Sequence, residues 1–222
     1  MTIYKFTALF ICCGILLGFT SDSPSASGIS VSGSASNDLC RALQGQNIRY
    51  KLYDAPSEAI VKAKKGSGVI IVADRYPDVR VSVSDADIKL AKEKKLRVYL
   101  EYPDAFPGIE TSSDPFVTNL ERLVVAGEAF APDLRRLALL GINEGYILKA
   151  DAPEPLLVAA KVAGFDSAVY GIDDVKKYPV LWIRDNFMIA ATKLSNFRTG
   201  RYEPTQSWKL LWENIISWVK GG

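Results

Sequence analysis

The chemistry open to this chain is restricted first by its lack of histidine. Its 222 residues contain no histidine, which excludes Ser-His-Asp, Cys-His and histidine-ligated metal sites within the chain. No cysteine cluster replaces them, and we expect neither a metal nor a cofactor. Cys40 is expected to be a buried small apolar residue rather than a reactive thiol. Any catalysis within this chain therefore depends on carboxylates, lysine, tyrosine or arginine.

Residues of these types follow several of the expected strands. In an open α/β sheet, ligands bind beyond the carboxyl ends of the strands, so we expect these residues to converge on one crevice. Carboxylates accept hydrogen bonds from sugar hydroxyls and aromatic rings cover apolar sugar faces, so the set suits a carbohydrate. The candidates are Ser34, Asp74, Arg75, Tyr76, Glu101, Tyr102, Asp104 and Glu128.

The charged residues in this set allow both a catalytic and a structural interpretation. Glu101 and Glu128 are candidates for a glycosidase pair, depending on their separation. Alternatively, Glu101 holds backbone amides of a neighbouring loop, as buried ends of scaffolds often require. Asp74 and Arg75 are equally suited to pairing with each other or capping loops. Both interpretations remain open at the level of sequence.

A polar, aromatic stretch near the C-terminus, "KLSNFRTGRYEPTQSW" (193–208), is expected to join the last strand to the last helix. This joint could border the crevice, and its candidate ligand-binding residues are Asn196, Arg198 and Arg201. We expect the two arginines to bind carboxylates or loop carbonyls rather than to act as catalysts. Asp185–Asn186 is expected to be a hairpin turn.

The elements that position these residues follow from hydrophobic periodicity. Short apolar or alternating runs separated by capped helical segments predict a β-α-β-α-β-α-β series and a doubly wound, mostly parallel α/β sheet. The second half carries shorter strands, a β-hairpin and a closing helix with an apolar stripe. Expected strands are 29–33, 47–54, 68–73, 96–103 and 122–130, the hairpin covers 178–194, and the closing helix covers 204–219.

The N-terminus has the layout of a secretory signal. One lysine precedes an apolar run over residues 6–19, which is too short for a comfortable membrane span of about 20 residues. We expect a signal peptide at 1–20, with cleavage as late as 27, a Ser-rich linker at 21–28, and one domain at 29–222. The expected location is periplasmic or extracellular. A lipid anchor at Cys12 or Cys13 is less favoured, because Phe-Ile-Cys precedes Cys13. The net charge of +2 gives no case for nucleic acid.

The series of elements resembles the class I glutamine amidotransferase-like fold, including its trehalose-utilisation-type branch. The resemblance covers roughly residues 29–220 and is most specific in the C-terminal blocks "PLLVAAKVAGFDSAVYGI", "YPVLWIRDNFMIAATKLSNFRTGRYEP" and "SWKLLWENIISWV". It implies a flavodoxin-like sheet. It also implies an association with secreted bacterial polysaccharide-degrading proteins, some of which carry a glycosidase domain.

The catalytic residues of that fold are missing from this chain. Catalytic members place a cysteine after a central strand and take a histidine and an acid from near the C-terminus. The comparable strand here, "LRVYLEYPDAF", runs into Glu101-Tyr102-Pro103. Glutaminase activity is therefore not expected.

The sequence favours a secreted, non-catalytic amidotransferase-like domain that serves as a scaffold or carbohydrate-binding accessory to polysaccharide degradation. The implied partners are a glycan and a glycosidase domain or protein. The rival interpretation is a glycoside hydrolase using the strand-end carboxylates. A third is that the chain is the N-terminal part of a longer enzyme.

Overall fold

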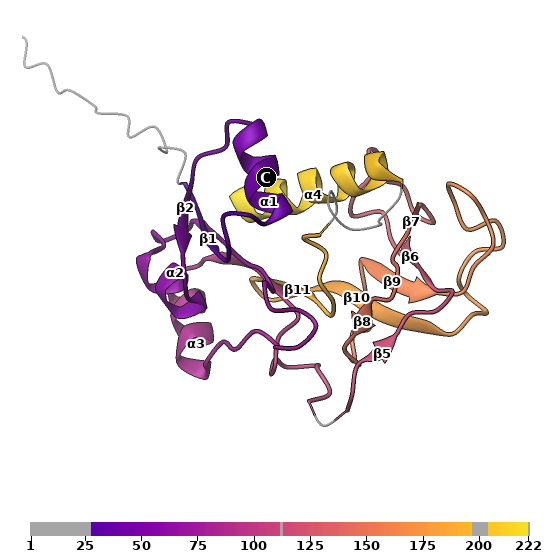
Figure 1. Ribbon diagram of the computed structural model, residues 1–222, viewed down its shortest axis with the longest axis horizontal. Coiled ribbons are helices and arrows are strands. Elements are labelled where there is room, and N and C mark those ends of the chain that lie inside the picture. The colour runs from indigo at the N-terminus through magenta and orange to yellow at the C-terminus, as the bar shows by residue number, and fades with distance from the viewer. Residues whose placement is uncertain (1–27, 112, 197–203, 222) are drawn as a thin grey trace, which may run out of the picture.

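The computed structural model describes residues 28–111, 113–196 and 204–221 (Figure 1). The expected signal peptide and nearly all of the expected linker lie outside these ranges, as do Arg198 and Arg201. All other candidate site residues lie within them.

The first half alternates strands with helices, as the periodicity predicts. Each strand except β2 is almost wholly buried, which suits strands covered on both faces. The elements are β1 (Ile29–Ser32), α1 (Asp38–Gly45), β2 (Tyr50–Tyr53), α2 (Pro56–Lys62), β3 (Gly68–Ile71), α3 (Asp85–Glu93) and β4 (Arg97–Glu101).

Local side-chain chemistry sets the helix ends in this half. The Asn37 side chain accepts a hydrogen bond from the Leu39 amide at the start of α1. Ser84 and Asp87 form a reciprocal capping box at the start of α3. At the other end of α3, the Lys94 ammonium donates to three carbonyls at the end of α2, including that of Val61 at 2.6 Å. These contacts hold α2 and α3 together.

The second half consists of shorter strands and one closing helix. The predicted strand at 122–130 is shorter than expected: it ends at Val125, and the chain bends at Gly127 and Glu128. The predicted hairpin and closing helix are confirmed. The elements are β5 (Phe116–Val117), β6 (Arg122–Val125), β7 (Leu139–Leu140), β8 (Tyr146–Ile147), β9 (Leu157–Ala160), β10 (Lys177–Arg184), β11 (Phe187–Ala190) and α4 (Thr205–Lys220).

Nine of the described strands form one mixed sheet in the order β2-β1-β3-β4-β11-β10-β9-β6-β7. The pairs from β2 to β11 are parallel, and every pair from β11 to β7 is antiparallel. Most strands therefore point the same way, and β10 and β6 run against them. The expected α/β class is confirmed, with a larger antiparallel part than the sequence predicts.

Helices cover both faces of the sheet in its parallel half. In Figure 1, α1 and α4 lie together on one side, while α2 and α3 lie on the other. The stripe of α4 is buried, with Trp208, Leu211, Trp212 and Ile215 at most 2% exposed. The Trp212 ring packs edge-on against Tyr99 of β4 at 5.2 Å between centroids. Helix α4 also contacts β7, so it spans the parallel and antiparallel parts.

Candidate functional site

The carboxyl ends of β1, β3, β4 and β11 meet in one hydrogen-bonded group of residues. Ser34 follows β1, and its backbone amide donates to the Asp74 carboxylate, which follows β3. The side-chain amide of Asn37 donates to the same carboxylate at 3.4 Å and to the Ser195 hydroxyl at 3.2 Å. Ser195 in turn donates to Glu101 at the end of β4. We call Ser34, Asn37, Asp74, Glu101 and Ser195 the strand-end network.

Glu101 is the centre of this network and is fully buried, with 0% exposure. Its Oε1 accepts hydrogen bonds from the Tyr99 hydroxyl and the Leu194 and Ser195 amides, at 2.8–3.0 Å. Its Oε2 accepts from the Ala73 amide and the Ser195 hydroxyl, both at 2.8 Å. One carboxylate therefore joins β3, β4 and the segment after β11, which is the structural role weighed for Glu101 in the sequence.

Burial dominates the protonation behaviour at this position. It raises the pKa of Glu101 above its ordinary value, although the Ala73 amide, Lys193 and Ser195 all favour the charged form. Burial and the neighbouring carboxyl also raise the pKa of the Tyr99 hydroxyl well above its ordinary range. The five hydrogen bonds occupy both carboxyl oxygens of Glu101, so a ligand cannot reach this acid without displacing the surrounding loop.

Asp74 is exposed and lies beside the loop that leads from β1 into α1, where its carboxylate accepts from the Ser34 backbone amide and the Asn37 side chain. Gly33 permits the close approach, because a Cβ there would lie 2.3 Å from a methyl carbon of Val72 and 3.2 Å from the Asp74 carboxylate. Within the network, the Ser34 backbone amide and the Asn37 side-chain amide therefore donate to groups of the protein itself.

Beside the network lies a cluster of three tyrosines, one of which sequence reasoning missed. Tyr76 packs edge-on against Tyr102 at 4.9 Å and Tyr146 at 6.1 Å between ring centroids. Its hydroxyl lies 3.1 Å from that of Thr192, and burial raises the pKa of Tyr76. Tyr146 arrives from β8, which lies outside the nine-stranded sheet, so no strand-end pattern identifies it.

The remaining candidates on this side of the molecule range from exposed to partly buried, whereas Ser34 and Asp74 of the strand-end network are both exposed. Arg75 is exposed. Asp104 is partly buried, and its backbone amide donates to the carbonyl of Val81 at 2.8 Å. Asn196, next to Ser195, is partly buried. These residues lie around the strand-end network and do not belong to it.

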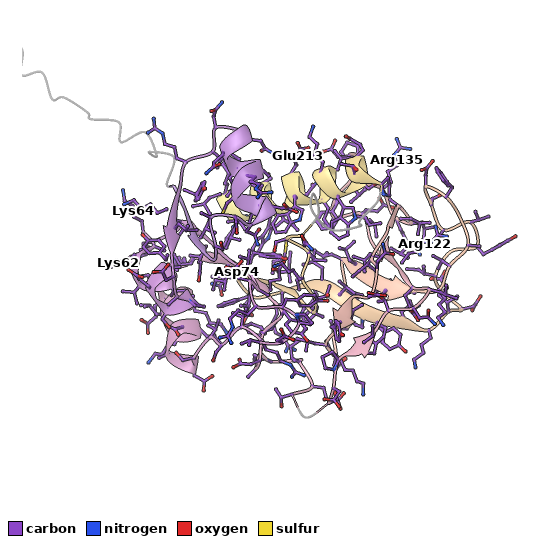
Figure 2. All side chains as sticks on the ribbon, viewed as in Figure 1. Lys62, Lys64, Asp74, Arg122, Arg135 and Glu213 are labelled. Carbon is purple, nitrogen blue, oxygen red and sulfur yellow. The ribbon has the colours of Figure 1, made fainter. Side chains whose placement is uncertain are left out.

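Glu128 does not join the other strand-end residues, which corrects the expected convergence. It follows β6, which runs antiparallel to β4. The carboxyl end of β6 therefore lies at the opposite end of the strands from the carboxyl end of β4. Between β4 and β6 lie four strand spacings of about 4.8 Å, or about 19 Å along the sheet. In Figure 2, Asp74 lies beneath α1 while Arg122 of β6 lies toward the other end of the molecule. The sequence could not predict this reversal, because strand direction depends on the connections.

Glu128 instead lines a separate cavity of about 570 Å³. Glu154 and Asp173 add carboxylates to it, and Arg136 and Lys177 add cations. Arg136 lies 3.6 Å from the Asp173 carboxylate, and Lys177 donates to the Asp173 carbonyl at 3.3 Å.

The rest of this cavity is apolar. Its walls include Leu156, Val158 and Ile172, together with the rings of Pro155 and Pro179. Among the described residues, the side chains of Glu128 and Glu154 form no hydrogen bond or ion pair, so these two exposed acids differ from Glu101 in being open to a ligand. The cavity therefore combines free acceptors, cations and apolar walls.

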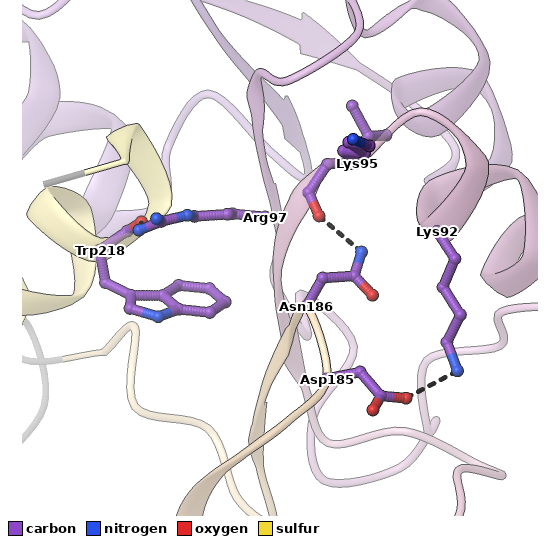
Figure 3. A pocket seen from close by; sticks show the side chains of 7 residues that line it. Lys92, Lys95, Arg97, Asp185, Asn186 and Trp218 are labelled. Atoms are coloured by element: carbon purple, nitrogen blue, oxygen red, sulfur yellow. Dashed lines mark hydrogen bonds and ion pairs between the residues drawn. The ribbon is translucent and has the colours of Figure 1, made fainter.

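A second cavity, of about 410 Å³, lies at the amino end of β4 (Figure 3). Lys92 pairs with Asp185 at 2.7 Å, and Asn186 donates to the Leu96 carbonyl. Arg97 donates to the Trp218 carbonyl at 2.9 Å and lies over its ring. These polar groups already bind one another. We therefore interpret the cavity as a structural contact region between α3, the predicted hairpin turn and α4 rather than as a ligand site.

Comparisons with known proteins do not assign this chain. No protein-family model matches it, and no curated protein matches it significantly. Among the described residues, no helix has the length and hydrophobicity needed to cross a membrane. The same residues contain no group of three or more acidic or cysteine side chains arranged to hold a metal ion.

Proposed function

We propose that this chain is an exported amidotransferase-like domain without catalytic activity, which binds carbohydrate as an accessory to polysaccharide degradation. The observation that carries the proposal is the state of Glu101. Where catalytic relatives of the resembled fold place a nucleophile, this chain places a carboxylate with no exposed surface and five hydrogen bonds to its own fold. That residue stabilises the fold and is not available to a substrate.

The strand order supports the flavodoxin-like part of the proposal. The run β2-β1-β3-β4-β11 repeats the pattern of flavodoxin-like sheets, in which the order reverses between the first and third strands. The N-terminal layout of a signal peptide supports export.

The cavity around Glu128 is the place that best suits a glycan. Its volume lies within the range of about 300–1,000 Å³ that is usual for ligand sites. Glu128 and Glu154 can accept hydrogen bonds from sugar hydroxyls, and Arg136 can donate to ring or hydroxyl oxygens. The proline and aliphatic walls suit the C–H faces of sugar rings.

The geometry argues against the glycosidase alternative in the form that pairs Glu101 with Glu128. The two acids of a glycosidase flank one bond, and even inverting enzymes separate them by only about 6.5–9.5 Å. The strands that lead to the two acids, β4 and β6, are about 19 Å apart along the sheet and run in opposite directions, and Glu101 is buried.

The proposed function is tested with soluble glycans and the purified protein. We expect a matching glycan to raise the melting temperature of the wild type without release of reducing sugar. Glu128→Gln is expected to weaken this binding about tenfold, since a charged hydrogen bond is worth about 1.5–3 kcal/mol. Glu58→Gln, a matched change at an exposed acid on α2, is expected to leave binding unchanged.

Two results would count against the proposal. Sugar release that disappears in Glu128→Gln would show that the domain is an enzyme. Failure of every glycan in a broad panel to stabilise the wild type would remove the carbohydrate assignment altogether.

A further inference from the structure

The loop at residues 161–176, between β9 and β10, carries an unusual concentration of exposed apolar side chains. Phe165 and Tyr170 are each 89% exposed and Val169 is 66% exposed. Of the large apolar side chains in the described part of the chain, only Leu120, at 71%, is comparably exposed. We call residues 161–176 the aromatic loop; it projects at the end of the molecule opposite α2 and α3 (Figure 1).

The aromatic loop is anchored to the sheet through its backbone. The Asp166 carbonyl accepts from the Leu139 amide at 3.0 Å, and the Ala168 amide donates to the Leu137 carbonyl at 2.9 Å. The Arg122 guanidinium donates to the Gly164 carbonyl at 2.6 Å.

Burial adds to this anchoring. Ala168 and Ile172 are buried in a small apolar cluster with Val124 and Val158. Gly164 has φ +142, and a Cβ there would lie 1.8 Å from the Ser167 carbonyl oxygen, so the turn requires glycine. The fold therefore holds Phe165 and Tyr170 outward on a fixed support.

The loop also forms part of the cavity around Glu128. Ile172 and Asp173 belong to the loop and line that cavity. Tyr170 is only two residues from Ile172, and two residues of chain span at most about 7 Å. The same loop therefore carries an exposed ring within a short stretch of chain from the cavity that contains free carboxylates and cations.

We propose that the aromatic loop extends this cavity into a binding platform for an extended polysaccharide chain. The inference rests on the proposed function and specifies its ligand as a polymer rather than a mono- or disaccharide. Sugar units bound in the cavity continue across Tyr170 and Phe165, whose rings stack against the apolar faces of successive sugars.

Area and charge favour a glycan over other occupants. Each ring offers about 150–250 Å², so the two offer about 300–500 Å², less than the roughly 800 Å² per partner of a standard protein interface. A narrow polysaccharide needs no larger surface. Within the loop, Asp166, Asp173 and Asp174 outnumber Lys161 and Lys176, which opposes attraction to an anionic membrane.

The test measures retardation of the protein in native gels that contain starch, β-glucan, xylan, mannan or pectin. Any polymer that retards the wild type is then compared with its own disaccharide and longer oligosaccharides by calorimetry. We expect Tyr170→Ala and Phe165→Ala each to weaken polymer binding about tenfold, with little change in disaccharide binding. Tyr170→Trp, which keeps a ring, is expected to retain binding. Val61→Ala, which trims an exposed apolar side chain on α2, serves as the control.

The outcomes separate this inference from the function on which it rests. If Glu128→Gln weakens binding while Tyr170→Ala and Phe165→Ala do not, the platform is refuted and the cavity remains a glycan site. If no polysaccharide or oligosaccharide binds the wild type, both proposals fail. If light scattering shows a wild-type dimer that Tyr170→Ala converts to a monomer, the loop is a protein interface and the platform is refuted.

Discussion

At the scale of single residues, Glu101 and Glu128 show that environment decides the role of a carboxylate. Glu101 is the last residue of β4, and Glu128 comes shortly after β6. Glu101 is enclosed by donors from Ala73, Leu194 and Ser195, whereas Glu128 is exposed beside a cavity. The first stabilises the fold, and the second is free to accept hydrogen bonds from a ligand.

Replacing each glutamate with glutamine tests this difference. We expect Glu101→Gln to lower the free energy of unfolding by about 2–4 kcal/mol, because the new amide nitrogen cannot accept from the buried donors around it. Glu128→Gln is expected to change stability by less than about 0.5 kcal/mol, as exposed substitutions usually do. Urea unfolding at neutral pH measures both values. Equal stability of the two variants would contradict the structural role of Glu101.

At the scale of elements, the start of α3 is set by the capping box of Ser84 and Asp87. Asp87 is mostly buried and accepts from the Ser84 hydroxyl at 2.6 Å and the Ser57 hydroxyl at 2.7 Å. Burial acts to raise the pKa of Asp87, but these hydrogen bonds outweigh it and lower the pKa below its ordinary value. Through Ser57, the same carboxylate links α3 to α2.

The capping box predicts a defined pH dependence for Asp87→Asn. Because the folded pKa is lowered, the stabilisation by Asp87 is present above the ordinary aspartate pKa and is lost as pH falls through the folded value. We expect Asp87→Asn to cost about 1 kcal/mol at neutral pH and much less in strong acid. Denaturant titrations across acidic pH measure the difference, with exposed Asp85→Asn as the control. A pH-independent difference would contradict this account.

At the scale of the whole molecule, α4 joins the two parts of the sheet. It packs on β3 and β4 and also contacts β7. The Trp212 indole donates to the Leu194 carbonyl at 2.9 Å, which holds the segment that supplies three of the five donors to Glu101. The position of α4 and the shape of the strand-end network are therefore coupled.

Gly68 sets the distance between α4 and the sheet. A Cβ at Gly68 would lie 2.3 Å from a methyl carbon of Val219 and 2.5 Å from its carbonyl oxygen. We expect Gly68→Ala to lower stability by about 1–3 kcal/mol, the usual cost of overpacking, and to speed amide exchange in α4.

Gly45→Ala is the matched control, since nothing lies within 4 Å of a Cβ there. It is expected to be neutral or slightly stabilising. If Gly68→Ala were as stable as Gly45→Ala, the close approach of α4 would not limit packing at this position. Chemical unfolding and hydrogen exchange measure both variants.

Local patterns in the sequence determined the type of most elements and part of the site. Capping residues and hydrophobic periodicity located α1 to α4 and the strands of the parallel half, because these signals act over a few residues. The turn at Asp185–Asn186 was predicted for the same reason. Consecutive strands joined by short crossovers also run parallel, so the convergence of Ser34, Asp74 and Glu101 followed from local information.

Only the tertiary structure decided where Glu128, Tyr146 and the cavity lie. The direction of β6 depends on how β9, β10 and β11 pair, and those contacts join residues far apart in sequence. The burial of Glu101 likewise depends on Leu194 and Ser195, about ninety residues later. Sequence periodicity reports which side of its own strand or helix a residue occupies, whereas the direction of distant strands and the closure of a loop over a carboxylate arise from long-range packing.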